Sequence, residues 1–211
     1  MPNPPHKLYN AESGAHPLPK DKREFEAVVC ATQRCYEAHP YFIDRYGVRG
    51  EVFARSDGGY LATLVSNPLS YVHAQVNWLA EFLSCRGMPR WLMESHLDLL
   101  CEELSKAVPA RVARHQKLLR AAQSLRSARQ MKINQADFDA LSADFETGAG
   151  TGLPNAGGLL VAAVCDEACG ISKAVPSLII WLGDPERFTA RWRDAVDETL
   201  ARARALAHQS L

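Results

Sequence analysis

Apolar residues recur at helical spacing along most of the chain. Val72, Val76, Leu79 and Leu83, for example, follow the three- and four-residue steps that place side chains on one face of an α-helix. No stretch shows the sustained alternation of apolar and polar residues that is typical of a half-buried β-strand. The pattern therefore predicts an all-α fold, a single multi-helix globular domain of about eight to ten helices.

The strongest start and stop signals mark a helical hairpin at residues 67–108. Asn67 is a good N-cap, because its side chain can accept a hydrogen bond from the first backbone N–H groups, and Pro68 has no N–H to lose. Gly87 suits the left-handed conformation that often ends a helix, and Pro89 can begin the next one. We therefore expect two helices joined by a corner at residues 86–89.

Two other segments lack the helical pattern. Residues 1–19 hold five prolines and few apolar residues, so we expect a flexible tail in front of a single helical domain at 20–211. Residues 147–158 are rich in glycine and are expected to form a flexible connector or a lid over a cavity. They do not match a phosphate-binding loop, because Gly-Lys-Ser and Gly-Lys-Thr are absent and an amphipathic helix, not a strand, precedes them.

Further helices are predicted at residues 20–39, 41–46, 58–66, 109–130, 135–147, 159–171, 176–182 and from 185 onward.

The composition argues against several classes of protein. The 211 residues are 47% apolar, enough for a sizeable core, and a formal net charge of zero at pH 7 provides no overall field to attract nucleic acid or an acidic membrane. No stretch approaches the roughly 18 uninterrupted apolar residues of a membrane-spanning helix, and the N-terminus lacks the apolar core of a signal peptide. Six cysteines without a Cys-x-x-Cys pair indicate reduced thiols. We therefore expect a soluble, cytoplasmic protein.

Several polar residues fall inside predicted apolar faces. His96 lies beside leucines of its helix, Glu103 follows on the same strip, and His115 falls in the apolar stripe of the next helix. Glu167 shares a stripe with apolar residues of its helix, whereas Asp166 lies off it. A buried carboxylate needs a partner, a proton or a metal, because burying a lone charge is very costly. His96 and Glu103 therefore either reach solvent or a neighbouring arginine at the edge of the stripe, or line a cavity, and Glu167 is a second candidate for a buried carboxylate.

Two groups of basic residues have the chemistry to bind an anion. Arg45 and Arg49 lie near aromatic residues, an arrangement that suits a propionate or a phosphate, and pairing with acidic side chains is the alternative. The segment at 106–132 holds eight Lys or Arg residues and no Asp or Glu. It is either a docking face for an anionic protein partner or a solvated face with salt bridges. Its lack of aromatic residues argues against nucleic acid.

No motif defines a reaction. HExxH and GxSxG are absent, and no Glu is followed three residues later by His, as a ferritin-like di-iron site requires. His96, Glu103 and Glu167 nevertheless carry the groups of metal ligands or of an acid–base set, provided that their helices meet. A metal-dependent or acid–base helical enzyme is therefore one alternative.

The second helix of the hairpin resembles the penultimate long helix of a globin, which often carries a His-Leu or similar pair and ends in a Pro-containing turn. The matching residues are Trp91-Leu-Met-Glu-Ser-His-Leu-Asp-Leu-Leu-Cys-Glu-Glu-Leu-Ser-Lys-Ala-Val-Pro, within 89–109. The resemblance implies a globin-like core with additional C-terminal helices, and a haem. It places His96 on the wrong helix for the proximal haem ligand and makes His73 the nearest upstream candidate.

Together these features predict a protein that binds a small molecule, with haem or another tetrapyrrole as the candidate cofactor and sensing or regulation as its role. The ligand would lie between the hairpin and the helix at 159–171. His96 or His73 would be the polar or axial contact, and Arg45 and Arg49 would pair with ligand carboxylates. The alternatives are the helical enzyme and a protein–protein interaction module that docks through the basic segment at 106–132, with a homodimer as a further expected assembly.

Overall fold

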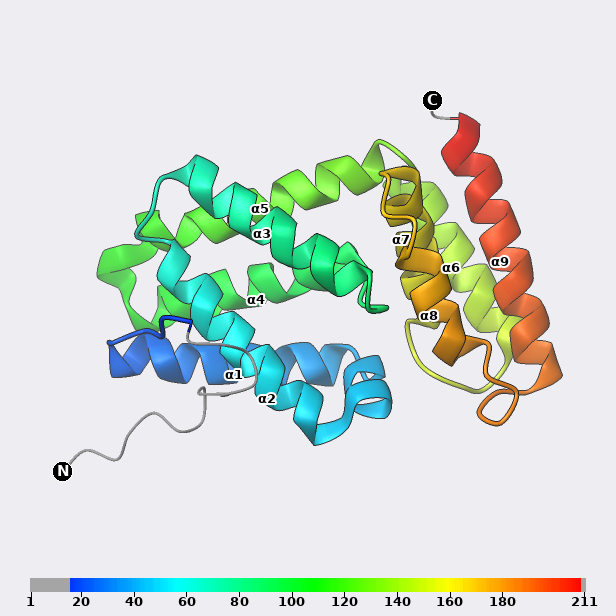
Figure 1. Ribbon diagram of the computed structural model, residues 1–211, viewed down its shortest axis with the longest axis horizontal. Helices are drawn as coiled ribbons and strands as arrows, with labels where there is room; N and C mark the ends of the chain where they lie inside the picture. Colours follow the sequence, from blue (N-terminus) through cyan, green and yellow to red (C-terminus); the bar gives the residue numbers. More distant parts are fainter. Residues whose placement is uncertain (1–15, 210–211) are drawn as a thin grey trace. The chain divides into compact units, whose positions relative to one another are not determined.

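The computed structural model describes residues 16–209, and these residues form helices with short connections and no strand (Figure 1). The all-α prediction is thus confirmed. The predicted flexible tail at 1–19 lies outside the described residues as far as residue 15. The described helices are α1 (Lys22–Ala38), α2 (Tyr41–Leu64), α3 (Leu69–Ser84), α4 (Arg90–Ala107), the 3₁₀ turn η2 (Pro109–Arg111), α5 (Val112–Gln130), α6 (Gln135–Ala149), α7 (Ala156–Ala168), α8 (Ala174–Leu182) and α9 (Ala190–Gln209).

Helix α2 joins two segments that the sequence pattern separates. Gly47 has a positive φ of 59° inside this helix, a conformation that glycine adopts more readily than other residues, so the predicted break is present as a kink. The chain resumes its helix directly afterwards. Ser56 and Asp57, which the pattern favours as a helix start, instead lie within α2.

Internal contacts divide the chain into two compact units. Within the described residues, unit 1 comprises 16–76 and 95–123, and unit 2 comprises 77–94 and 124–209. Helices α3, α4 and α5 contribute residues to both units. None of the described helices is long and apolar enough to cross a membrane.

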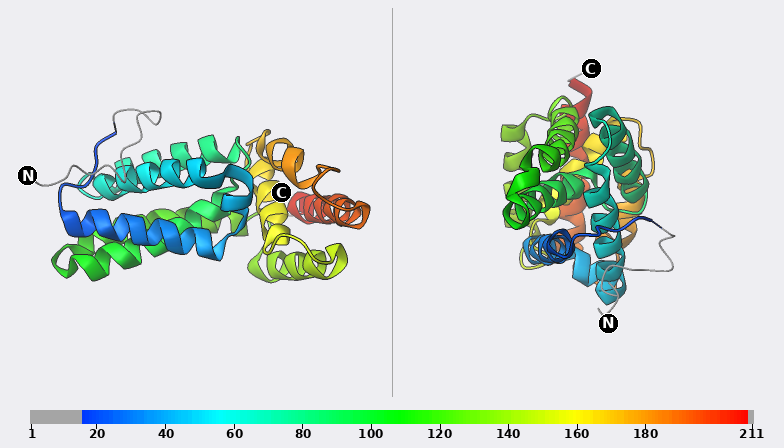
Figure 2. Two further views of the ribbon diagram at one scale, coloured as in Figure 1. Left: turned by 90° about the horizontal axis from the view of Figure 1, so that it is seen from below. Right: turned by 90° about the vertical axis from the view of Figure 1, so that its left-hand side faces the viewer.

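Unit 1 is built around the packing of α1 against α2, which lie side by side in Figure 2. Gly58 allows close approach on this face, because a Cβ atom there would lie 3.1 Å from Val28 Cγ1 and 3.2 Å from His96 Nε2. The hairpin predicted from residues 67–108 is present as α3 and α4. The fully buried side chains of unit 1 include Val28, Ala31, Leu61, Leu97, Leu100, Leu104 and Leu118.

Unit 2 is organised around α7, which packs against α6, α8 and α9. Every residue from 156 to 166 is buried, so the prediction of a central apolar helix here is confirmed, although it begins and ends earlier than the expected 159–171. Phe145 of α6 and Trp192 of α9 meet edge to face, with ring centroids 4.9 Å apart. The two rings therefore form part of the packing between α6 and α9.

The glycine-rich segment forms a shorter connection than the expected 147–158. Helix α6 continues to Ala149 and α7 already begins at Ala156. Gly157 lies in the contact between these helices, because a Cβ atom there would lie 2.6 Å from the backbone oxygen of Ser142. The glycine therefore permits close helix packing.

Candidate functional site

His96 lies on α4 and faces α2. Its side chain is half-buried, with Nε2 close to Gly58. Burial lowers the pKa of His96 to about 4, so the ring is neutral at neutral pH. The prediction that His96 lies inside an apolar arc is therefore confirmed, and the described surroundings are those of a helix-packing contact.

Glu103 forms ion pairs with Arg34 and, at 3.1 Å, with Lys106. Burial raises the pKa of Glu103, but the hydrogen bonds from Lys106 and Arg34 outweigh it and lower the pKa overall. The interpretation that this carboxylate reaches a neighbouring arginine at the edge of the stripe is confirmed.

The prediction for Glu167 is wrong, because the buried carboxylate of α7 is Asp166. The Asp166 side chain is 3% exposed, whereas Glu167 is 29% exposed and pairs with Arg204 at 2.8 Å. Asp166 accepts hydrogen bonds from Ser84 Oγ at 2.7 Å, from the backbone N–H of Arg90 at 2.9 Å and from its Nε at 2.7 Å. Because α7 is buried on all sides from residue 156 to residue 166, the apolar pattern does not identify its inner face, and Asp166 faces the N-terminus of α4.

The expected metal ligands belong to different parts of the fold. No group of three or more His, Cys, Asp or Glu side chains within residues 16–209 is arranged to hold a metal ion. His96 and Glu103 lie in unit 1 and Glu167 lies in unit 2, so their convergence stays a prediction from sequence. His73 is half-buried on α3, and its Nε2 has no hydrogen-bond partner in the described part of the chain.

Arg45 and Arg49 contact aromatic rings of α2. The Arg45 guanidinium lies 5.7 Å from the Tyr41 ring centroid and 5.2 Å from that of Tyr46, and it donates to the Tyr41 hydroxyl at 2.5 Å. The Arg49 guanidinium lies 5.8 Å from the Phe53 ring centroid. Cation–π contacts of this kind orient both side chains along their own helix.

Most of the basic segment at 106–132 is already paired. Arg129 is buried and donates to both oxygens of Glu94, at 3.0 and 3.1 Å, while Lys117 donates to the backbone oxygens of Val65 and Asn67. The salt-bridge interpretation is confirmed for Arg129, whereas Lys117 is held by backbone carbonyl oxygens. Within the described chain the cations with partners are Lys106, Arg111, Lys117, Arg126 and Arg129.

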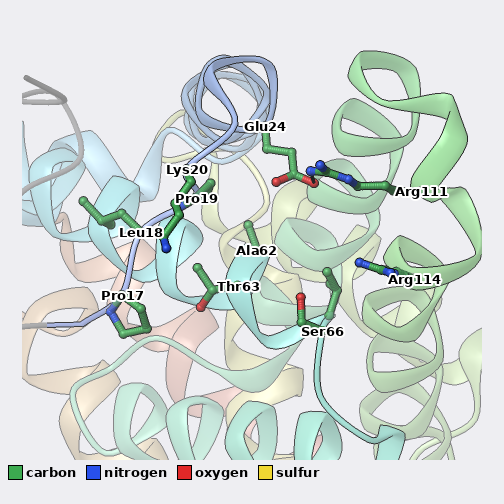
Figure 3. Close-up of a pocket in the computed structure, with 11 residues that line it drawn as sticks. Pro17, Leu18, Pro19, Lys20, Glu24, Ala62, Thr63, Ser66, Arg111 and Arg114 are labelled. Carbon is green, nitrogen blue, oxygen red and sulfur yellow. Dashed lines mark ion pairs between the residues drawn. The ribbon is translucent and has the colours of Figure 1, made fainter. Parts of the chain in front are cut away.

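A cavity of about 270 Å³ opens in unit 1 (Figure 3). Its walls are the segment at 17–20, the first turn of α1, the end of α2, the turn η2 and the start of α5. Lys20, Arg111 and Arg114 line it together with a single carboxylate, Glu24. The cavity therefore carries an excess of positive charge.

Local sequence signals explain why these side chains converge. Asp21 caps α1 by accepting from the Arg23 backbone N–H, which places Glu24 in the first turn, where a carboxylate suits the helix dipole. Arg111 ends the 3₁₀ turn η2 and Arg114 lies three residues later in the first turn of α5, and both side chains line the cavity. Lys117 holds the end of α2 through the carbonyl oxygens described above, and this brings Ser66 to the rim.

Only some of the cations at the cavity are engaged. Arg111 Nη1 lies 2.9 Å from Glu24 Oε1, and this hydrogen bond raises the pKa of Arg111. Lys20 and Arg114 are exposed and have no ion-pair partner among residues 16–209. Figure 3 shows them on opposite walls of the cavity. Neither His96 nor His73 is among the lining residues.

Comparison with models of known protein families, with curated proteins and with solved structures found no match to this chain. The globin resemblance and the tetrapyrrole therefore stay predictions from sequence.

Proposed function

We propose that this protein binds a small anionic molecule in the cavity of unit 1. The observation that carries the proposal is the convergence of Lys20, Arg111 and Arg114 on a space that contains one opposing carboxylate. Two of these cations have no carboxylate partner in the described chain. Arginine and lysine at such a position recognise carboxylates and phosphates through charge-assisted hydrogen bonds.

The size of the cavity supports a compact ligand. Its volume of about 270 Å³ lies just below the roughly 300–1,000 Å³ that is typical of ligand pockets. A small oxyanion or small organic acid suits this space better than a tetrapyrrole. Leu18 and Pro19 are half-buried in one wall and add apolar surface beside the charges.

Sensing or regulation is the role that we propose for binding. The ligand would contact four segments that are far apart in the sequence: residues 17–20 and parts of α1, α2 and α5. A ligand that bridges them favours the conformation in which they are together, so occupancy is linked to the stability of unit 1.

Isothermal titration with inorganic phosphate in a phosphate-free, low-salt buffer tests the proposal. Arg114→Ala is expected to weaken binding at least about tenfold, because hydrogen bonds to charged groups contribute about 1.5–3 kcal/mol. Arg120→Ala is the matched control, since Arg120 is exposed on the same helix and does not line the cavity. Absence of binding to the wild-type protein at millimolar phosphate, or equal affinity in the two variants, would contradict the proposal.

The prediction of tetrapyrrole binding is tested separately, by absorption spectroscopy. If haem binds with His96 or His73 as the axial contact, its addition produces a sharp Soret band that His96→Ala or His73→Ala abolishes. Arg45 and Arg49 would then pair with its carboxylates. Absence of a Soret band from the wild-type protein after haem is added would contradict haem binding, and a band that neither substitution changes would exclude His96 and His73 as axial ligands. Neither outcome bears on the anion site.

A further inference from the structure

The two carboxylate oxygens of Glu24 have different surroundings. Oε1 lies 2.9 Å from Arg111 Nη1 and 3.4 Å from His115 Nε2. Oε2 has no hydrogen-bond partner among residues 16–209, while the side chain lines the cavity. Figure 3 shows one carboxylate oxygen against Arg111 and the other turned away from it. The cavity therefore presents an available acceptor as well as cations.

The surroundings of Glu24 hold this acceptor in place. His115 is fully buried behind the carboxylate, and burial lowers its pKa against the opposing effect of Glu24, so the ring is neutral at neutral pH. Arg111 contacts the same oxygen from the 3₁₀ turn η2, which directly precedes α5. The contacts on Oε1 from η2 and α5 fix the orientation of the group, and the Glu24 side chain itself is only 12% exposed.

A fixed carboxylate discriminates among anions. It repels any ligand that has only negative oxygens, because like charges at short range are unfavourable and partial burial strengthens the effect. A ligand that places an O–H or N–H group against Glu24 Oε2 replaces this repulsion by a charge-assisted hydrogen bond.

We infer that the ligand is an oxyanion that also carries a hydrogen-bond donor, the hydrogen phosphate group being the simplest, and that Glu24 selects it. This inference rests on the proposed anion site. The charged oxygens of the ligand face Lys20 and Arg114 across the cavity, and its O–H donates to Glu24 Oε2. Glu24 is thus a specificity residue.

Phosphate and sulfate form the matched probe pair. They have the same tetrahedral shape, and phosphate keeps an O–H at neutral pH whereas sulfate has none. Isothermal titration of the full chain is expected to give at least about tenfold tighter binding of phosphate, a ratio that corresponds to about 1.4 kcal/mol. Equal binding of the two anions overturns the inference and leaves the proposed function intact, and absence of binding by either contradicts the proposed function itself.

Two variants assign the discrimination to Glu24. Glu24→Gln offers an amide N–H in place of the negative oxygen, so sulfate binding is expected to strengthen and the preference to fall below about threefold. Glu26→Gln makes the same charge change at an exposed position of α1, where Glu26 pairs only with Lys22 at 3.6 Å, and is expected to keep the wild-type preference. An unchanged preference in Glu24→Gln overturns the inference.

The source of the phosphate group is resolved by a third titrant. Tighter binding of inorganic phosphate than of glycerol phosphate identifies the free ion as the ligand. The phosphate group of an ester is mostly without an O–H at neutral pH, so the reverse order identifies an ester whose own hydroxyl groups supply the donor to Glu24. The wild-type comparison of phosphate with sulfate needs no substitution, so the inference can be overturned even if Glu24→Gln does not fold.

Discussion

Asp166 secures the beginning of α4 through three hydrogen bonds from two residues. Because its side chain is 3% exposed and that of Arg90 is 15% exposed, removal of the carboxylate leaves a poorly solvated guanidinium and an uncapped helix start. We expect Asp166→Ala to lower the free energy of unfolding by about 3 kcal/mol, near the lower end of the range for a broken buried ion pair. Urea-induced unfolding measures this change.

The neighbouring carboxylate provides the control. Glu167 pairs with Arg204, whose side chain is 44% exposed, and such surface pairs contribute about 0–1 kcal/mol. Glu167→Ala should therefore have little effect on the urea midpoint. Similar losses from the two substitutions would show that burial of Asp166 does not govern its contribution.

His96 makes stability depend on pH. Its pKa is about 4 in the folded protein against a reference value of 6.5, so protonation favours the unfolded state. The stability that the neutral His96 side chain contributes is therefore fully present above pH 6.5 and is lost as the pH falls towards 4. At pH 5 the loss from this one group is about 2 kcal/mol, at 1.36 kcal/mol per pKa unit.

The contribution of His96 is isolated by substitution. His96→Gln is expected to reduce the fall in unfolding free energy between pH 7 and pH 5 by about 2 kcal/mol. Asp57, whose pKa burial raises to about 7, acts in the opposite sense over this range, so the comparison must be made between variant and wild type. His208→Gln, at an exposed position, should retain the wild-type pH dependence. Identical pH profiles for all three proteins would contradict the prediction.

At the scale of elements, glycine determines how closely α6 and α7 pack. A Cβ atom at residue 157 would lie 2.6 Å from the Ser142 backbone oxygen and 2.8 Å from its Cα, and a backbone cannot yield as a flexible side chain does. Gly157→Ala is expected to lower the free energy of unfolding by about 1–3 kcal/mol, the usual range for overpacking. Thermal or urea unfolding measures it.

Gly148 offers a control in the same pair of helices. An added Cβ there would meet only Ala195 Cβ at 4.0 Å, an ordinary contact. Gly148→Ala should therefore raise stability by about 0.5–1 kcal/mol through helix propensity. A stabilising Gly157→Ala would disprove the close-packing interpretation.

The sequence pattern predicts elements better than it predicts their faces. Helical spacing and the Asn67, Gly87 and Pro89 signals are local, and so the α3–α4 hairpin follows from them. The assignment of Glu167 to the buried stripe fails because every residue of α7 from Ala156 to Cys165 is buried, so the apolar residues do not define a single inner face from which to choose between Asp166 and Glu167. In a helix that is apolar on nearly all sides, periodicity carries little information.

At the scale of the whole molecule, the candidate site could not be read from sequence. Glu24 occupies an unremarkable first turn, Lys20 precedes a helix, and Arg114 is one of eight cations in a basic segment. Tertiary contacts decide which of those cations are paired: Arg129 is buried against Glu94, whereas Arg114 stays exposed at the cavity. Only the convergence of four distant segments distinguishes Arg114 from Arg120.

The same convergence makes ligand binding a determinant of global stability. A ligand that binds only the folded protein stabilises it by RT ln(1 + [L]/Kd), which is about 2.7 kcal/mol at 100 mM phosphate for a Kd of about 1 mM. For a chain of this size the midpoint of thermal unfolding should then rise by about 5–10 °C. Phosphate and sulfate also stabilise proteins by exclusion from their surface, so the relevant quantity is the rise in wild type minus that in Arg114→Ala. Calorimetry is expected to give a positive difference with phosphate and a smaller difference with sulfate. Equal rises of the midpoint in wild type and Arg114→Ala would show that phosphate stabilises only by exclusion from the surface, which would contradict a specific site.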